Sequence, residues 1–455
     1  MTIHHFDHGN DFRVRGRLQA SLQAKDPGDA VILGLDKKIP YDFVRDKGYT
    51  YGLHFDPNVF PTDPAGCLSY MQGCSCKRPI VNNSGVFDSS DWSMDDMFFE
   101  GVRYITMDFH GNEISELDPM DLTKDINGND TTDELSVMNV MLEIPRRYVK
   151  RFAGGIVHSS YENEGSPDAF IRGSHTYKYL DIGVYPMSKV EYTDGSGQRS
   201  IGTSNSQLKP CSNIAGATLR AMAQATDSEL EWHVWNWHEY QLWKDMVLFA
   251  TKSFNSQATV GKGQCNAGNS PEYWSVNGGV DHVVDKAGPW YGDLTATNKP
   301  VKALIENPWG ELWQLVDDCL LTNLRTDDTD PENPLYYQDI YAGQNDNAHI
   351  DDLTTSKSLI ASIPVPSNRI SSGGWVYSQA IDTTQLGWGL PSGMTGDTST
   401  GLCDGHYMQA NAQKAVRVGG SSFDGLAAGL SALALDNGLS RSLWSCGARL
   451  AFVHD

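Results

Sequence analysis

Closely spaced glycines divide the segment from residue 403 to residue 452, and this spacing constrains the fold more than any other feature of the chain. They are Gly419, Gly420, Gly425, Gly429, Gly438 and Gly447. Glycine adopts positive φ at little steric cost, so each one marks a turn or a bulge. The segment therefore predicts short β-strands joined by turns. The whole chain contains 44 glycines and 20 prolines among 455 residues, which favours many strands and loops.

Residues 440–445 form two alternating sets, which an extended strand would place on opposite faces. Two sets of three residues interleave there: Ser440, Ser442 and Trp444 with Arg441, Leu443 and Ser445. A strand would place the two sets on opposite faces. The second set combines a cation, an aliphatic chain and a hydroxyl, which favours recognition of a partner over catalysis. An ordinary terminal pair of strands that closes the core is the alternative interpretation.

The same segment resembles the C-terminal part of C-type-lectin-fold variable proteins of phages, which are diversified by retroelements. Residues 440–450 match that family's Ser-x-Ser-x-Trp-x-x-Gly-x-Arg-Leu motif, whereas Ser422 replaces the Trp of its Gly-Gly-x-Trp-x-x-Gly motif. The resemblance implies a C-type lectin fold with a variable ligand-binding face. The expected ligand-binding residues are the family's varied positions together with Trp444: Phe423, Asp424, Ala434, Asp436, Arg441, Leu443 and Ser445.

Two apolar stripes predict buried helices. After Trp232, apolar residues recur at spacings of three and four: Tyr240, Trp243, Val247, Ala250 and Phe254. A second helix is expected to begin at Asn307-Pro308, because Asn caps helices and Pro suits the first position. Its apolar face would be Trp309, Leu312, Trp313, Val316 and Cys319. Its first residues, 307–313, are similar to the second helix of the fold's branch that includes formylglycine-generating enzymes.

The sequence predicts an α+β protein with three parts. Residues 1–57 are expected to form an N-terminal arm or attachment subdomain, and residues 58–160 a β-rich hairpin domain. Within the latter, 102–109 and 137–144 predict strands, and 111–121 with 143–148 resemble a hairpin and strand of phage tail fibres. Residues 161–455 are expected to form a C-type-lectin-like domain with two buried helices and a glycine-punctuated antiparallel sheet.

The acidic balance of the chain excludes several classes of partner. The net charge is −22, with 35 basic and 57 acidic residues. A nucleic acid or an anionic membrane surface needs a basic patch, and no long run of Lys or Arg occurs. No stretch of 18 apolar residues is present, and the N-terminus lacks the pattern of a signal peptide. We therefore expect that the protein does not insert into a membrane. We expect it to be assembled in a host cytoplasm.

Few residues suggest catalysis or a metal. No nucleophile, zinc-protease or phosphate-loop motif occurs, so an enzyme is not expected. Asp404 and His406 are expected to be structural, with Asp404 capping local backbone N–H groups. Cysteines 67, 74 and 76 favour packed thiols over a metal site. No cofactor is expected. One acidic region is interpreted as a solvated loop, and a calcium site is the alternative, because calcium prefers oxygen ligands. That region contains Asp327, Asp328, Asp330, Glu332, Asp339, Asp346, Asp351 and Asp352.

The resemblance implies a phage virion adhesin, meaning a tail-fibre or receptor-binding protein. Its partners would be a host cell-surface receptor, protein or glycan, and other virion proteins. A homotrimer is implied by the resemblance. It is also implied by the gain in overall binding strength when several weak sites are linked. The alternatives are a structural or decoration protein of the virion without receptor binding, and an enzyme of the formylglycine-generating type.

Overall fold

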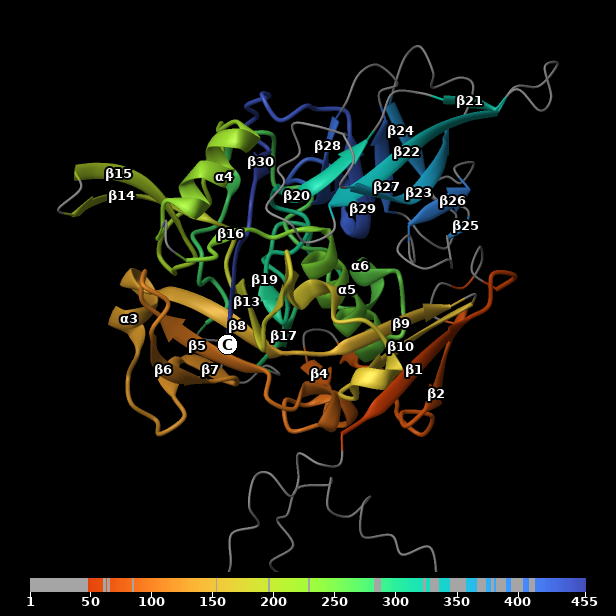
Figure 1. Ribbon diagram of the computed structural model, residues 1–455, viewed down its shortest axis with the longest axis horizontal. Coiled ribbons are helices and arrows are strands. Elements are labelled where there is room, and N and C mark those ends of the chain that lie inside the picture. The colour runs from red at the N-terminus through yellow and green to blue at the C-terminus, as the bar shows by residue number, and fades with distance from the viewer. Residues whose placement is uncertain are drawn as a thin grey trace, which may run out of the picture.

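Antiparallel β-sheets are the main regular structure of this protein, and helices are few (Figure 1). The computed structural model describes residues 48–455 except 60–62, 64–65, 84–85, 153, 195–196, 228–229, 282–287, 322–324, 328–334, 344–356, 366–373, 378–379, 382–389, 394–403 and 409–413. Most of the predicted N-terminal arm, residues 1–47, lies outside this range. Among the described helices, none is long and apolar enough to cross a membrane.

A four-stranded sheet lies at one end of the molecule (Figure 1). Its order is β2-β1-β10-β9, and all pairs are antiparallel. The strands are β1 (Thr50–Phe55), β2 (Leu68–Gln72), β9 (Tyr148–Phe152) and β10 (Gly155–Ser159). Residues 50–55, expected in a separate arm, therefore pair directly with residues 155–159 of the expected hairpin domain.

A seven-stranded antiparallel sheet joins distant parts of the chain. Its order is β16-β31-β13-β8-β5-β6-β7. The strands are β5 (Arg103–Met107), β6 (Glu113–Asp118), β7 (Asp121–Asp125), β8 (Asn139–Pro145), β13 (Tyr179–Gly183), β16 (His233–Val234) and β31 (Leu450–His454). The strands predicted at 102–109 and 137–144 are confirmed as β5 and β8. Because β8 pairs with β13, this sheet continues across the boundary predicted between residues 160 and 161.

The third large sheet, of nine strands, lies at the opposite end of the molecule (Figure 1). Its main path is β21-β22-β20-β28-β29-β27-β24, with β23 beside β22 and β30 beside β20. The pairs β20–β30 and β27–β29 are parallel, and the others are antiparallel. The strands are β20 (Trp313–Leu321), β21 (Arg325–Asp327), β22 (Leu335–Gly343), β23 (Lys357–Val365), β24 (Gly374–Tyr377), β27 (Gly405–Met408), β28 (Lys414–Gly419), β29 (Gly429–Leu435) and β30 (Cys446–Gly447).

Short elements complete the described structure. The remaining helices are α3 (Thr132–Val137), α4 (Gly216–Gln224) and α6 (Ser256–Thr259). The remaining strands are β3 (Val81–Asn83), β4 (Val86–Asp88), β11 (Ile171–Arg172), β12 (His175–Thr176), β14 (Ser188–Asp194), β15 (Gly197–Thr203), β17 (Trp290–Tyr291), β18 (Lys302–Ala303), β19 (Ile305–Glu306), β25 (Ala380–Ile381) and β26 (Pro391–Gly393).

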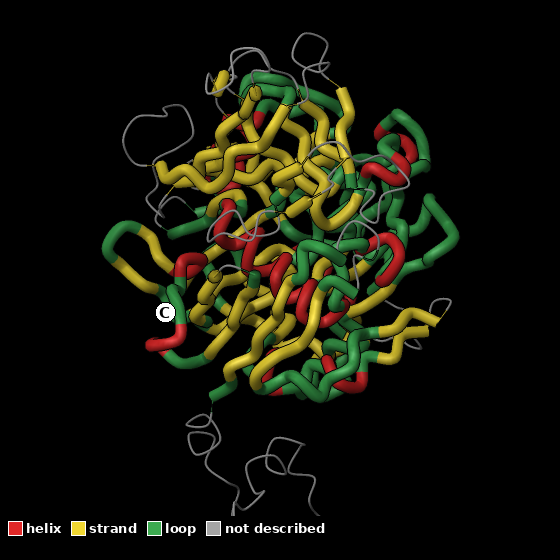
Figure 2. Tube along the Cα trace, turned by 90° about the vertical axis from the view of Figure 1, so that its right-hand side faces the viewer, coloured by secondary structure: helices red, strands yellow, loops and turns green. Residues whose placement is uncertain are grey.

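The first predicted helix is confirmed as α5 (Trp237–Thr251), and it lies between the sheets at the two ends of the molecule (Figures 1 and 2). Tyr240 Oη donates a hydrogen bond to the carbonyl of Leu430 in β29, over 2.7 Å. On the other side, Tyr70 Oη of β2 donates to the carbonyl of Phe249, over 2.6 Å. Almost every side chain of α5 is buried, so the helix is the centre of one continuous hydrophobic core.

The start of α5 is fixed by a reciprocal cap. The side-chain oxygen of Asn236 accepts hydrogen bonds from the backbone N–H groups of His238 (2.9 Å) and Glu239 (3.1 Å). In return, Glu239 Oε2 accepts from the backbone N–H of Asn236, over 2.8 Å. This arrangement satisfies N–H groups that a helix leaves unpaired in its first turn.

The second predicted helix is wrong, because residues 307–319 form a turn followed by β20. Asn307 has φ +47°, and its side chain donates to Glu311 Oε2 over 3.0 Å instead of capping a helix. Gln314 is as fully buried as its neighbours Leu315 and Val316. A strand that is buried on both faces loses the alternation of apolar and polar residues, so its pattern resembles that of a buried helix.

Arg449 ties the end of the chain to this core. Its guanidinium is fully buried and donates to Gln314 Oε1 (2.9 Å) and to the carbonyls of Gly183 (2.8 Å), Val184 (2.9 Å) and Glu306 (2.7 Å). Burial lowers the pKa of this guanidinium to about 9, although Glu306 and Glu311 oppose the shift. The Arg of the matched Gly-x-Arg-Leu motif thus holds backbone carbonyls of two separate segments and the side chain of Gln314.

Candidate functional site

The expected glycine turns are present between β28 and β29. Gly419 has φ +93° and Gly420 has φ +89°, a region that other residues rarely adopt. A Cβ on Gly419 would lie 2.5 Å from the carbonyl oxygen of Pro308, so the space also requires glycine. This turn leads into residues 421–428, where two of the expected ligand-binding residues lie.

Phe423 and Asp424 have different environments. The Phe423 side chain is 63% exposed, the largest exposed fraction among the described large hydrophobic residues. Asp424 Oδ2 instead accepts hydrogen bonds from the backbone N–H (2.6 Å) and Oγ (2.7 Å) of Ser421. Burial raises the pKa of Asp424, and the bonds from Ser421 oppose that shift. Asp424 therefore shapes the loop, while Phe423 projects from it.

The strand expected at residues 440–445 is a loop. Turn-type hydrogen bonds run from Arg441 N to the carbonyl of Gly438 (3.2 Å) and from Cys446 N to that of Leu443 (3.2 Å). Ser440, Arg441 and Ser442 are all exposed, so the expected alternation of faces does not occur. Three following residues are half-buried: Leu443, Trp444 and Ser445.

Ala434 does not reach the surface. It lies in β29, is 5% exposed, and packs with Trp313, Ala432 and Cys446 in a small cluster that Leu443 covers. A ligand at the surface could not contact the Ala434 side chain directly. Asp436, just beyond β29, is half-buried.

A segment that the sequence did not suggest lies against these loops. The backbone N–H groups of Ala267 and Gly268 donate to the carbonyl of Ser422, over 3.0 and 3.1 Å. The buried ring of Trp274 stacks on Trp444, with centroids 6.5 Å apart and an interplanar angle of 21°. Its neighbour Tyr273 is 48% exposed. The sequence signals were weak, because an aromatic pair in a glycine-rich loop does not indicate its distant partner.

The accessible side chains on these neighbouring loops are called here the aromatic surface. A Cβ on Gly268 would lie 2.3 Å from the Tyr273 ring, which places Tyr273 beside the Ser422–Phe423 loop. Leu426, in the same loop as Phe423, is 46% exposed. The aromatic surface consists of Tyr273, Phe423, Leu426, Arg441 and Trp444.

Asp404 and His406 lie in the core, as their structural interpretation requires. Asp404 Oδ2 accepts a hydrogen bond from the backbone N–H of Ser431, over 2.6 Å. This N–H belongs to the distant strand β29 and not to the local backbone that the sequence predicted. Burial raises the pKa of Asp404 to about 7 and lowers that of His406 to about 3. Cys403, next to Asp404 in the chain, lies outside the described residues.

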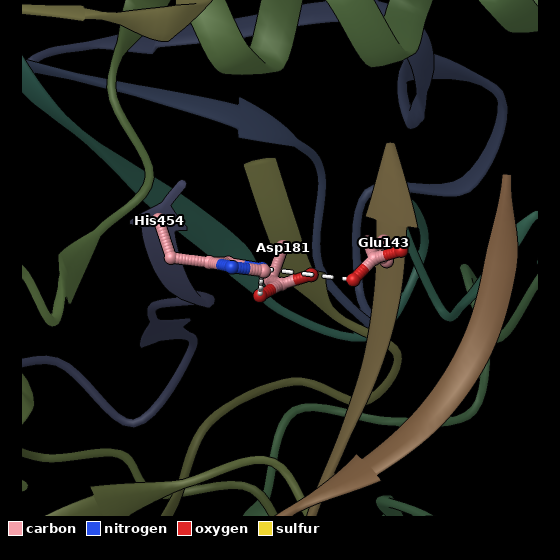
Figure 3. Close-up of side chains that lie close together, drawn as sticks. All are labelled: Glu143, Asp181 and His454. Carbon is pink, nitrogen blue, oxygen red and sulfur yellow. Dashed lines mark ion pairs between the residues drawn. The ribbon is translucent and has the colours of Figure 1, made fainter. Parts of the chain in front are cut away.

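A second cluster of functional side chains lies on the seven-stranded sheet (Figure 3). Glu143 of β8 and Asp181 of β13 are directly opposite in register, and His454 of β31 lies diagonally across from Asp181. His454 Nε2 is 3.1 Å from Asp181 Oδ2 and 3.6 Å from Glu143 Oε2. The sequence analysis missed this cluster, because three residues this far apart in the chain give no spacing signal.

The charges in this cluster depend on one another. Burial opposes a charge on His454, but Asp181 and Glu143 raise its pKa to about 10. Burial raises the pKa of Asp181 to about 6, and His454 opposes that shift. Burial also acts to raise the pKa of Glu143, but His454 and Arg103 hold it below its usual value. Arg103 Nη2 lies 2.7 Å from Glu143 Oε1, on the side away from His454.

Among the described residues, neither the acidic region nor cysteines 67, 74 and 76, for which a metal was the alternative interpretation, forms a group of three possible metal ligands. Of the acidic residues considered for calcium, only Asp327 and Asp339 are described, and Asp339 Oδ1 accepts from Ser362 Oγ over 2.6 Å. The calcium alternative therefore falls mostly outside the described residues. Cys67 and Cys74 are buried free thiols, and Cys76 is an exposed one.

Comparison of the chain with protein-family models and with curated proteins finds no match. The resemblance to C-type-lectin-fold variable proteins therefore stays a prediction from the quoted motifs.

Proposed function

We propose that this protein is a phage virion adhesin whose C-terminal part has a C-type lectin fold and binds a receptor on the host surface. The observation that carries this proposal is the aromatic surface. It combines three accessible aromatic side chains, those of Tyr273, Phe423 and Trp444, with the exposed cationic side chain of Arg441. All four lie on loops anchored to a buried sheet.

The chemistry of this surface suits recognition. Aromatic residues and Arg are enriched among the residues that contribute most to binding energy at protein interfaces. Exposed apolar side chains in one group indicate an interaction site more strongly than scattered ones do. The anchoring is rigid, because Asp424, Gly419 and the stacked Trp274 fix the loops from below.

The structure refines the set of contact residues that we propose. Phe423, Arg441 and Trp444 are retained, and Tyr273 and Leu426 are added. Asp424 and Ala434 are removed from direct contact, since the first shapes its loop and the second is buried. Leu443, Ser445 and Asp436 are half-buried and border the surface.

The proposed setting is the virion, on a tail fibre or similar appendage, with other virion proteins as neighbours. A homotrimer would present three copies of the aromatic surface. Linked weak sites bind more tightly than any single one, by a factor of up to about 10²–10⁴. Such a gain makes a small surface sufficient for attachment.

The test uses the purified full chain, an array of bacterial surface glycans and, separately, extracts of bacterial surface proteins. We expect binding in one of the two arms, and we expect Phe423→Ala and Arg441→Ala each to reduce it at least about tenfold, the loss typical of important interface residues. Tyr161→Ala and Arg78→Ala are the matched controls, because both side chains are exposed and lie outside the aromatic surface.

Melting temperatures of all four variants establish that they fold. Binding that survives both Phe423→Ala and Arg441→Ala would refute the proposed contact surface. Absence of binding in both arms would favour the alternative, a structural virion protein without a receptor.

A further inference from the structure

We propose that Glu143, Asp181 and His454 form a binding site for one divalent transition-metal ion such as Zn²⁺. This inference is independent of the proposed receptor binding, because the site lies on the seven-stranded sheet and shares no residue with the aromatic surface.

The geometry of the three donor atoms fits a metal ion. They lie within 4.8 Å of one another, and the two measured separations from His454 Nε2 are 3.1 and 3.6 Å. Donors about 2.0–2.2 Å from a zinc ion are separated by roughly 3.0–3.6 Å when they subtend octahedral or tetrahedral angles. Figure 3 shows the His454 ring directed at the two carboxylates, which come from neighbouring strands.

Asp181 supplies independent evidence for a missing ligand. Its side chain is 0% exposed; its Oδ2 pairs with His454 Nε2 at 3.1 Å, and among the described residues its Oδ1 accepts no hydrogen bond. Buried carboxylates are normally hydrogen-bonded, paired or bound to a metal, because removing such a group from water is costly. The ion pair with His454 offsets only part of that cost, whereas a bound cation would engage the carboxylate directly.

Neighbouring groups hold the other two donors in place. Arg103 binds Glu143 Oε1 through Nε (2.8 Å) and Nη2 (2.7 Å), which leaves Oε2 directed at His454. The His454 ring is stacked between Tyr179, at 5.1 Å and 20°, and Phe452, at 5.5 Å and 15°. Partners of this kind, which orient metal ligands from behind, commonly accompany real metal sites.

The donor set favours zinc, cobalt or manganese over calcium. Imidazole nitrogen suits transition metals, and carboxylate oxygen completes a mixed set, whereas calcium takes oxygen ligands alone. His454 is 28% exposed at its side chain, while Glu143 and Asp181 are 3% and 0% exposed, so the ion would enter from the His454 side. A bound ion would link β8, β13 and β31 across the sheet.

The test titrates the full chain, freed of metal by a chelator, with ZnCl₂ in a calorimeter and with CoCl₂ in a spectrophotometer. We expect one equivalent of zinc and a visible Co²⁺ absorption band that zinc abolishes. His454→Ala and Asp181→Asn should each weaken zinc binding more than about 100-fold, since even outer partners of metal ligands contribute 10–100-fold. Asp181→Asn preserves shape, so it keeps the test valid if His454→Ala fails to fold.

His175→Ala is the matched control. His175 is an exposed histidine that pairs with Asp455, and Asp455 directly follows His454 in the chain. The His175→Ala variant should bind zinc as the wild type does. The proposal is overturned if the wild type binds no zinc, or if folded Asp181→Asn binds it with unchanged affinity. Either result would leave Glu143, Asp181 and His454 as an ion-pair network only.

Discussion

Replacing Glu239 with Gln should destabilise the protein in a way that depends on pH. Glu239 is fully buried and holds three partners: the backbone N–H of Asn236, His233 Nε2 at 2.7 Å, and Arg172. A Gln side chain keeps the shape and the cap but removes the charge that His233 and Arg172 face. Breaking a buried ion pair typically costs about 3–5 kcal/mol.

The pH dependence follows from the pKa of Glu239. Burial acts to raise it, but His233 and Arg172 lower it to about 2, from the ordinary value of 4.5. At about 1.36 kcal/mol per pKa unit, ionisation contributes roughly 3 kcal/mol to the free energy of unfolding. Because the folded pKa is the lower one, this contribution is complete above pH 4.5 and is lost as the pH falls through 2. About 2 kcal/mol of it disappears between pH 7 and pH 3.

Urea denaturation of the wild type and Glu239→Gln at intervals from pH 7 to pH 3 measures this directly. The difference in unfolding free energy should be largest at pH 7 and should shrink by about 2 kcal/mol at pH 3. Other carboxylates affect both proteins equally and cancel in the difference. Glu164→Gln, at an exposed position, should stay within about 0.5 kcal/mol of the wild type throughout. A wild-type-minus-variant difference that is constant with pH would refute the reasoning.

Four further substitutions test how the core and the turns are built. Gly419→Ala should lower the unfolding free energy by more than about 2 kcal/mol, because positive φ and a backbone carbonyl 2.5 Å away both oppose a Cβ. Gly128→Ala, with φ +85° but nothing within 4 Å, should cost only about 1–2 kcal/mol, and equal losses by urea denaturation would contradict the steric argument. Gly429→Ala should lower the melting temperature sharply, since its Cβ would lie 2.1 Å from Asp404 Oδ1; an unchanged melting temperature would disprove that contact. Arg449→Met should lower the free energy of unfolding by more than about 4 kcal/mol, because several buried acceptors lose their donor. A soluble variant that unfolds like the wild type would show that water replaces the guanidinium.

The features predicted correctly from the sequence are those that depend on local chemistry. The stripe containing Tyr240 and Trp243 predicts α5, because apolar residues at spacings of three and four fall on one face of a helix. The turns at Gly419 and Gly420 follow from the conformational freedom of glycine. The failure at Asn307 has an equally physical cause: its side chain donates to Glu311 and its carbonyl accepts from the Gln314 side chain, and these bonds outweigh the capping preference.

The candidate sites depend on pairings that no local pattern specifies. Tyr273 joins the aromatic surface because its segment packs against residue 422, and this contact has no signature in the sequence. The expected strand at 440–445 fails because its carbonyls bond to separate segments: that of Leu443 accepts from Asn213 N and that of Ser445 from Trp313 N, which replaces a single strand partner. Glu143, Asp181 and His454 meet only through sheet register.

The position of β31 has a consequence for how the chain is made. Residues 450–454 insert between β13 and β16, and every other strand of that sheet precedes them in the chain. During translation all residues up to about 454 must therefore have left the ribosome before this sheet can close. A message truncated shortly before codon 450 would yield a chain with a gap between two sheet edges, exposed to aggregation and proteases.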